Sequence, residues 1–170
     1  MYFWCALLFL ALLPGVQAGF AADRDGAEIV RWINSHAQRN LGEELPTARA
    51  IVVGDLDGDG RDDVAVLYTL RARGQGGERR YLAVFKRAHD NKLDNKQAVL
   101  RYHAHVLVGG SGAAEVNRAT ILDKTVLIEM LTYRAGDPAC CPTRPAARRY
   151  RLTPRGLAVV NPPVNAKTTP

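Results

Sequence analysis

The spacing of apolar residues along the chain has two different periods. In the first, apolar residues recur every three or four positions, at Ile29, Trp32, Ile33 and Ala37. This spacing places them on one face of a helix. Asp25 and Glu28 have the spacing of a capping box, and Gly42 is a typical helix stop. The pattern predicts one amphipathic helix over residues 26–41.

The second period is two, and it begins near Arg49. Alternating or continuous apolar stretches rich in Val, Ile, Leu and Tyr are separated by Gly, Asp, Asn and Pro, as in short strands joined by turns. The expected strands are 49–54, 64–70, 81–86, 98–108, 115–122, 125–133, 148–152 and 157–160. There is no internal repeat. We therefore expect an α+β fold, in which one N-terminal amphipathic helix packs on an antiparallel β-meander of about seven or eight strands.

The N-terminus has the pattern of an export signal. Residues 1–13 are uniformly apolar and are followed by Pro14-Gly15 and by Val16-Gln17-Ala18. An apolar run of this length before small residues is typical of a secretory signal peptide, with cleavage expected after Ala18 or, alternatively, after Ala21 or Ala22. The other interpretation is an uncleaved anchor, but Pro14, Gly15 and Gln17 interrupt the apolar run that a spanning helix needs.

Composition and the N-terminal pattern together predict the number of domains and the location of the protein. The chain has 170 residues, 47% hydrophobic and 24% charged residues, and a net charge of +6, which is typical of a globular protein and not of a disordered one. We expect a signal peptide over 1–18, a single domain over 19–160 and a loose C-terminal tail over 161–170. We also expect no stable membrane span after cleavage, and a periplasmic or secreted location.

The segment 54–66 carries the clearest chemical signal, because four of its five aspartates have the spacing of metal ligands around glycines. Hard cations such as Ca²⁺ take oxygen ligands from alternate positions of a tight loop. Here these positions are Asp55, Asp57, Asp59, the Arg61 carbonyl and Asp63. Oxygen ligands without neighbouring His or Cys favour Ca²⁺ over Zn²⁺ or copper. The alternative is a polar Asp-Gly turn without an ion.

The motif DxDGDGxxD at residues 55–63 resembles the calcium-binding loops of the FG-GAP and VCBS families. It resembles the EF-hand less closely, since an EF-hand has a bidentate Glu at its last position, where this chain has Val66. The FG-GAP resemblance implies that Asp55, Asp57, Asp59 and Asp63 are Ca²⁺ ligands. It implies no propeller, because the motif occurs once. We expect the ion to join two strands and to stabilise the domain, in preference to a role in signalling or catalysis.

Cys140 and Cys141 are adjacent in the proline-bounded segment 137–143. In an oxidising compartment we expect them to form a vicinal disulfide, and the alternatives are pairing with another chain or free, redox-active thiols. This segment resembles the DPxCCP segment of certain small exported bacterial proteins and lipoproteins, a likeness that implies no activity.

Basic residues dominate the C-terminal part, where no acid follows Asp137. They form a candidate patch for an anionic partner: Arg144, Arg148, Arg149, Arg151 and Arg155. The partner classes we expect are an anionic cell-envelope polymer or a cell-wall hydrolase. Nucleic acid is not expected, because no nucleic-acid-binding motif accompanies the charge.

Three further groups of residues are weaker candidates. His103 and His105 alternate on one strand, so we expect them to share a solvent-facing side, where a metal would still need a third ligand. Glu115 and Glu129 are candidate carboxylates for glycoside chemistry. Ser111 lies in Gly-Gly-Ser-Gly, which predicts a turn and not a nucleophile elbow.

From these observations we expect an exported calcium-binding protein that binds a partner and is not an enzyme. A first alternative is a periplasmic inhibitor or immunity protein acting against a cell-wall hydrolase, by analogy with periplasmic inhibitors that carry a similar aspartate loop. A second is a small cell-wall hydrolase that uses Glu129 or His105.

Overall fold

The computed structural model describes residues 17–74, 77–89 and 98–160, with side chains from Arg24 onward. One helix, α1 (Gln17–Arg39), precedes nine strands and a short 3-10 turn, η1 (Pro46–Ala48). The strands are β1 (Gly42–Glu44), β2 (Ala50–Gly54), β3 (Asp63–Ala72), β4 (Glu78–His89), β5 (Ala98–Gly110), β6 (Ala114–Leu122), β7 (Thr125–Thr132), β8 (Arg144–Thr153) and β9 (Gly156–Val160). No helix within the described ranges is long and apolar enough to span a membrane.

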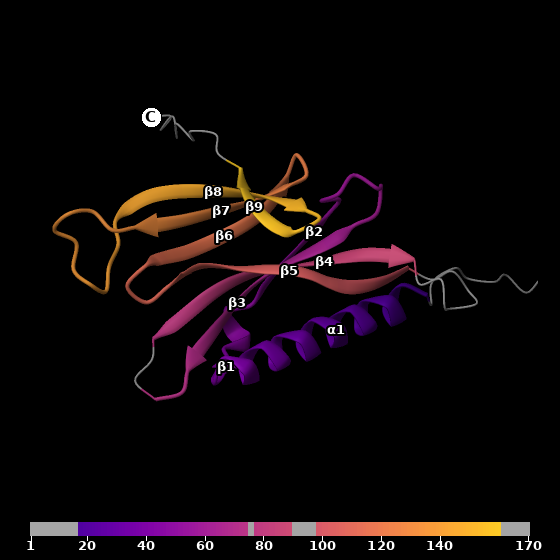
Figure 1. The fold of residues 1–170 in the computed structure, drawn as a ribbon, viewed down its shortest axis with the longest axis horizontal. Helices are drawn as coiled ribbons and strands as arrows, with labels where there is room; N and C mark the ends of the chain where they lie inside the picture. The colour runs from indigo at the N-terminus through magenta and orange to yellow at the C-terminus, as the bar shows by residue number, and fades with distance from the viewer. Residues whose placement is uncertain (1–16, 75–76, 90–97, 161–170) are drawn as a thin grey trace, which may run out of the picture.

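All strand pairs are antiparallel, and the strands from β3 to β9 are hydrogen-bonded in chain order. β1 and β2 both pair with β3 and form the other edge end to end. The meander is therefore continuous, but it is not flat. β5 and β6 are paired only at Gly110 and Ala114, and beyond this pair the sheet separates into two layers, one built from β1 to β5 and the other from β6 to β9 (Figure 1).

Two hydrophobic cores hold three layers together. The inner core lies between the two sheet layers and includes Leu67, Leu82, Val84, Ile128 and Tyr150. The other core lies between α1 and the opposite face of β3, β4 and β5, where Ile29 and Ile33 of the helix pack on the sheet (Figure 1). Residues 64–68 and 81–85 are buried on both faces, which explains their continuous apolar sequence.

The predicted α+β class and the antiparallel meander are confirmed, with two corrections. The helix spans 17–39 instead of 26–41, so Asp25 lies inside it and does not cap it, and the Asp25 carboxylate binds the Arg87 guanidinium of β4. Within the described residues the sheet has nine strands, one more than the eight that the sequence predicted, and the additional strand is β1. That strand has only three residues, and pairing with Leu70, Arg71 and Ala72 of β3 holds it in place. The predicted signal peptide lies outside the described residues except for positions 17 and 18, and the predicted tail lies outside them entirely.

Candidate metal centre

The aspartate loop is the tip of the hairpin formed by β2 and β3, whose last paired residues are Gly54 and Asp63. Gly58 and Gly60 have φ values of 85° and 80°, a conformation that glycine adopts at little cost. These two residues turn the chain sharply, as the sequence predicted for Gly60. The aspartates between them are thereby held within one short loop.

Side-chain hydrogen bonds to the backbone shape the loop from within. The carboxylate of Asp55 accepts the amide N–H of Gly58 at 2.6 Å and that of Gly60 at 3.1 Å. The carboxylate of Asp57 accepts the N–H of Asp59 at 3.1 Å. Such bonds favour a turn in which the carboxylates face inward.

Asp63 connects the loop to the sheet. Its side chain is fully buried, at 0% exposure, and its two oxygens accept the backbone N–H groups of Leu56 at 3.1 Å and Arg87 at 2.9 Å. Burial raises the pKa of this carboxyl, the negative charges of Asp57 and Asp59 raise it further, and the two backbone bonds oppose the change. A cation beside Asp63 would offset this repulsion.

One carboxylate oxygen from each of Asp55, Asp57 and Asp63 lies within 4.8 Å of the other two. Two ligands of one Ca²⁺ ion, each at about 2.4 Å from it, are separated by at most about 4.8 Å. Three hard oxygen donors at this spacing therefore fit a shared divalent cation of the calcium type. We name these three residues the aspartate cluster.

Two of the five predicted ligand positions are not in this cluster. The Asp59 carboxylate instead forms an ion pair with the Arg61 guanidinium at 2.5 Å, and it also accepts the Arg61 N–H at 2.9 Å. The Arg61 carbonyl remains a predicted ligand. The tertiary structure thus brings Asp55, Asp57 and Asp63 together, whereas the Asp59 carboxylate contacts Arg61.

The cluster has a protein cation beside it, which the sequence did not predict. Lys86 of β4 places its Nζ 2.6 Å from Oδ2 of Asp57. The hydrogen bond from Lys86 lowers the pKa of the Asp57 carboxyl, and the same bond raises the pKa of Lys86. A metal ion that binds Asp57 would compete with this ammonium.

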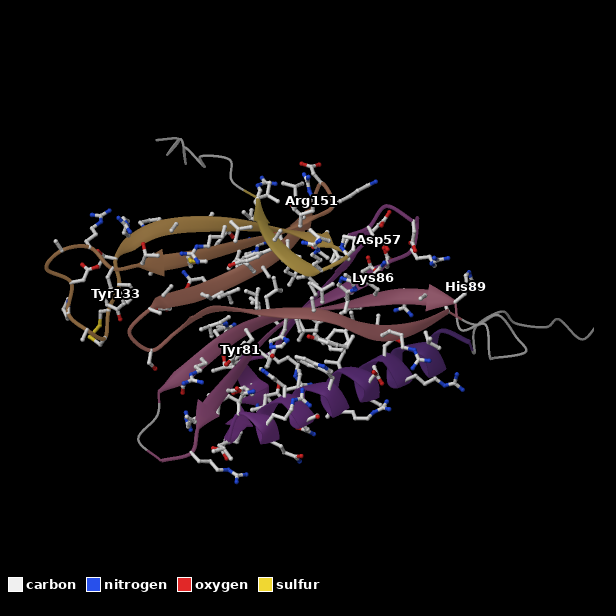
Figure 2. All side chains as sticks on the ribbon, viewed as in Figure 1. Asp57, Tyr81, Lys86, His89, Tyr133 and Arg151 are labelled. Atoms are coloured by element: carbon white, nitrogen blue, oxygen red, sulfur yellow. A yellow bond between two sulfur atoms is a disulfide. The ribbon has the colours of Figure 1, made fainter. Side chains whose placement is uncertain are left out.

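A groove of about 510 Å³ opens beside the loop. Its lining includes both basic and acidic side chains, and Figure 2 shows Asp57, Lys86 and Arg151 gathered at this end of the molecule. The residues that carry its positive charge are Lys86, Lys124 and Arg151. Its acidic residues are Asp57 and Asp123, and the groove joins the aspartate loop at Asp57.

The predicted arginine patch lies on β8 and the following turn, but strand alternation divides it. Tyr150 and Leu152 contribute to the inner core, so Arg149 and Arg151, which alternate with them, project to the outer face of the layer. Arg144 and Arg148 are in phase with Tyr150 and Leu152, on the face of β8 that contributes to the core, but both are exposed. Arg155 is exposed in the turn before β9, and Arg151 alone of the five lines the groove.

Cys140 and Cys141 are joined by a disulfide within the chain, as the first of the three sequence interpretations predicted. The loop that holds them is organised by Asp137, whose carboxylate accepts the N–H of Arg134 at 2.7 Å and the N–H and hydroxyl of Thr143, both at 2.9 Å. The Tyr133 hydroxyl donates to the carbonyl of Ala139 at 2.5 Å. The disulfide is therefore carried by an ordered loop.

The prediction that His103 and His105 share one face is wrong. The β4–β5 register shifts between Val84 and Phe85, so that Phe85 pairs with Tyr102 and Val84 with Ala104. This bulge at His103 reverses the alternation. His103 Nε2 lies 2.9 Å from the Thr153 carbonyl on β8, whereas His105 lies on the helix side.

His105 belongs instead to an aromatic cluster that the sequence analysis missed. Its ring centroid lies 4.4 Å from that of the buried His36 on α1 and 5.2 Å from that of Trp32. Tyr102 stacks on Trp32 at 4.2 Å. Helical spacing had already placed Trp32 on the sheet-facing side of α1. That His105 of β5 contacts it could not be predicted, because the bulge at His103 puts His105 on the helix side.

The other weak candidates are also placed. Glu115 is opposite Leu131 and Glu129 is opposite Arg118 on the β6–β7 pair, so the two carboxylates are not directly opposite each other. They are diagonal neighbours, because Glu129 and Leu131 share one face of β7. Ser111 lies in the turn between β5 and β6, as predicted, and its hydroxyl accepts the N–H of Glu78 at 2.9 Å.

Comparison with protein families identifies one matching segment, the FG-GAP repeat at residues 47–76. The matched segment contains β2, the aspartate loop and β3, and it covers a minor part of the chain. Comparison with curated proteins and with solved structures gives no significant match. This segment is therefore similar to one FG-GAP repeat.

Proposed function

We propose that this protein is an exported, calcium-stabilised binding domain, with Ca²⁺ held by the aspartate loop. The observation that carries the proposal is the convergence of Asp55, Asp57 and Asp63 within 4.8 Å, inside the segment that matches the FG-GAP repeat. FG-GAP repeats often bind calcium and are typically extracellular. Asp59 and the Arg61 carbonyl would complete the ligand set that the sequence motif suggests.

The ion would have a structural role. It would neutralise the repulsion among the aspartates and hold the β2–β3 hairpin against Arg87 of β4, to which Asp63 is already hydrogen-bonded. An extracellular type of site with a Kd near ~10⁻⁴ M would contribute about 1–2 kcal/mol in millimolar calcium. For a domain of this size, this corresponds to a rise of about 3–6 °C in Tm.

The test is thermal unfolding in millimolar CaCl₂ and in EDTA, together with calorimetric titration of Ca²⁺. We expect EDTA to lower the Tm of the natural protein and Asp57→Asn to remove the difference. Asp62→Asn is the matched control, because Asp62 is an exposed aspartate of the same loop outside the cluster, and it should retain the difference. Equal melting in calcium and EDTA, with no heat of Ca²⁺ binding, would contradict the proposal.

We propose binding and not catalysis as the activity, with an anionic cell-envelope polymer as the partner. The support is the groove whose lining includes the basic residues Lys86, Lys124 and Arg151. Sedimentation with purified cell wall should be lost in Lys124→Glu. Stoichiometric inhibition of a lysozyme-like hydrolase would favour the inhibitor alternative, and peptidoglycan turnover that is lost in Glu129→Gln would show an enzyme.

For export, the support is the vicinal disulfide, a bond typical of oxidising compartments, together with the signal-peptide pattern of residues 1–18. N-terminal sequencing of protein from the periplasm or medium tests it. A mature N-terminus at Gly19 is expected, and recovery of the intact chain from the cytoplasm would contradict the proposal.

A further inference from the structure

A second pocket, of about 350 Å³, lies at the end of the two sheet layers that is remote from the aspartate loop. Figure 2 shows Tyr133, which lines this pocket, at the opposite end of the molecule from Asp57. Its lining comes from the β3–β4 pair, the β5–β6 turn and the cysteine loop, and includes Thr69, Arg80, Ser111, Glu115, Tyr133 and Cys140. We name it the Arg80 pocket.

Arg80 occupies a position that the strand pattern reserves for apolar side chains. Leu82 and Val84, two and four residues further along β4, belong to the core between the two layers. Since side chains alternate along a strand, Arg80 projects to the same side as they do. Its cross-strand partner is Thr69, which is buried. A guanidinium therefore lies at the open end of the inner core.

This guanidinium forms no ion pair among the residues that the structure describes, although Glu78 and Glu115 line the same pocket. One of its terminal nitrogens donates to Thr69 Oγ1 at 3.1 Å, and its Nε is buried with no hydrogen-bond partner within the described part of the chain. The nearby Glu78 carboxylate accepts from Arg71 at 2.8 Å. Burial lowers the pKa of Arg80, and only the charge of Glu78 opposes this effect. Arg80 is only partly buried, but its Nε is buried, and a partly desolvated cation without an ion-pair partner favours binding of an anion.

The pocket is preformed, because the β5–β6 turn is clamped to the start of β4. The N–H of Glu78 donates to Ser111 Oγ at 2.9 Å, and the N–H of Ser111 donates to the Glu78 carbonyl at 2.8 Å. A Cβ on Gly77 would lie 2.6 Å from the Ser111 Cβ, so the two segments are in close contact. Rigid walls of this kind are typical of small-ligand sites.

We propose that the Arg80 pocket binds the carboxylate of a free amino acid or short peptide, with Arg80 as the counter-ion. A planar guanidinium can donate two parallel N–H bonds to a carboxylate. The Ser111 hydroxyl can also donate to the ligand, because its oxygen only accepts the hydrogen bond from the Glu78 N–H and its hydrogen is not used in that bond. Glu78 and Glu115 also line the pocket and would receive the ligand's ammonium group. The volume suits an amino acid or a dipeptide, and the site does not depend on calcium.

The test is an NMR titration of the exported protein with alanyl-alanine, followed by backbone amide signals. We expect saturable one-to-one shifts at Ser111, Gly112 and Cys140, in calcium and in EDTA alike. Alanyl-alanine amide lacks the carboxylate and should bind at least about tenfold more weakly. Equal binding of the two peptides, no saturable shift, or shifts confined to other segments would overturn the proposal.

Two variants assign the effect to Arg80. Arg80→Gln should abolish binding of alanyl-alanine, and Arg80→Lys should weaken it, because an ammonium keeps the charge without the planar donor pair. Arg79→Gln is the matched control, since Arg79 is the exposed neighbour on the other side of β4, and it should bind normally. Normal binding by Arg80→Gln would overturn the proposal. If that variant does not fold, the comparison of the two peptides on the unsubstituted protein still decides it.

Discussion

The Nζ atom of Lys86 lies 2.6 Å from Oδ2 of Asp57, so an ammonium group of β4 contacts one of the three aspartates that converge in the β2–β3 loop. The protein thus has its own cation where a metal ion would bind. A calcium ion on this carboxylate would be repelled by the ammonium and would compete with it for the negative charge of Asp57. This relationship makes the affinity for calcium depend on a residue outside the loop motif.

We therefore predict that Lys86→Gln binds Ca²⁺ more tightly than the natural protein. A partly exposed ion pair contributes about 0.2–1 kcal/mol, so the gain in affinity should be about 1.4- to fivefold. Calorimetric titration at low and high salt checks this, and the gain should shrink as salt screens the pair. Arg79→Gln, which removes a positive charge elsewhere, should leave the affinity unchanged. Weaker binding by Lys86→Gln would show that Lys86 supports the site.

The second prediction concerns the buried histidine of α1. His36 Nδ1 lies 2.8 Å from the Tyr68 hydroxyl, and burial, helped by the charges of His105 and Arg39, lowers the pKa of His36 from 6.5 to about 4. The unfolded chain therefore binds the proton more readily than the folded one between these pH values. The contribution of neutral His36 to the free energy of unfolding is therefore fully present above pH 6.5 and is lost as the pH falls towards 4.

Between pH 7 and pH 5, the loss due to His36 should be about 2 kcal/mol, measured by urea unfolding at each pH. His36→Gln keeps a hydrogen-bonding group for Tyr68 and has no proton to gain, so its stability should vary less over this range. His103→Gln, on the other side of the bulge, controls for the loss of a histidine as such. An unchanged pH profile in His36→Gln would refute the assignment.

The third prediction tests the point at which the sheet separates into two layers. Gly110 has a φ of 139°, and a Cβ there would lie 2.3 Å from the Glu78 carbonyl oxygen. Gly110→Ala should therefore lower the free energy of unfolding by more than about 2 kcal/mol. At Gly112, with a φ of 73°, a Cβ would meet nothing within 4 Å, so Gly112→Ala should cost only about 1 kcal/mol. Equal effects in urea unfolding would contradict the close packing at Gly110.

The fourth prediction separates the disulfide from the loop that carries it. If Cys140 and Cys141 are joined within one chain, the intact mass of the exported protein should be about 2 Da below its reduced mass. A bond between adjacent residues closes a very short loop and restricts the unfolded chain little, so reduction should change stability by less than about 1 kcal/mol. A disulfide-linked dimer on a non-reducing gel would show the intermolecular alternative.

Asp137, and not the disulfide, should hold this loop in shape, because its carboxylate accepts three hydrogen bonds from Arg134 and Thr143. Asp137→Ala should speed amide hydrogen exchange at Arg134 and Thr143, since both amides lose their acceptor. The Cys140→Ser and Cys141→Ser double variant should leave exchange at these two amides nearly unchanged. The reverse order of effects would make the disulfide the organising element.

Some features depend on residues close together in sequence, and these were predictable. The apolar spacing from Ile29 to Ala37 identified the helix, and alternation identified all the strands except β1. The motif around Asp55 and Asp63 identified the loop because glycine bends and carboxylate spacing are local properties. Predicted boundaries differ from the observed ones where tertiary contacts compete with local preference, as at Asp25, which binds Arg87 and does not cap the helix.

The sequence alone was enough to predict most of the elements, their order, the acidic loop and the adjacency of the two cysteines, because these follow from short-range periodicity and turn chemistry. Contacts between distant side chains, in contrast, depend on the three-dimensional packing. The bulge at His103 sent two histidines to opposite sides, Lys86 came to Asp57, and Asp59 turned to Arg61. The two layers separate beyond Gly110, and Arg80 lies in a pocket between them without an ion-pair partner among the described residues. Such contacts depend on strand register and on how two layers pack, which no local pattern encodes.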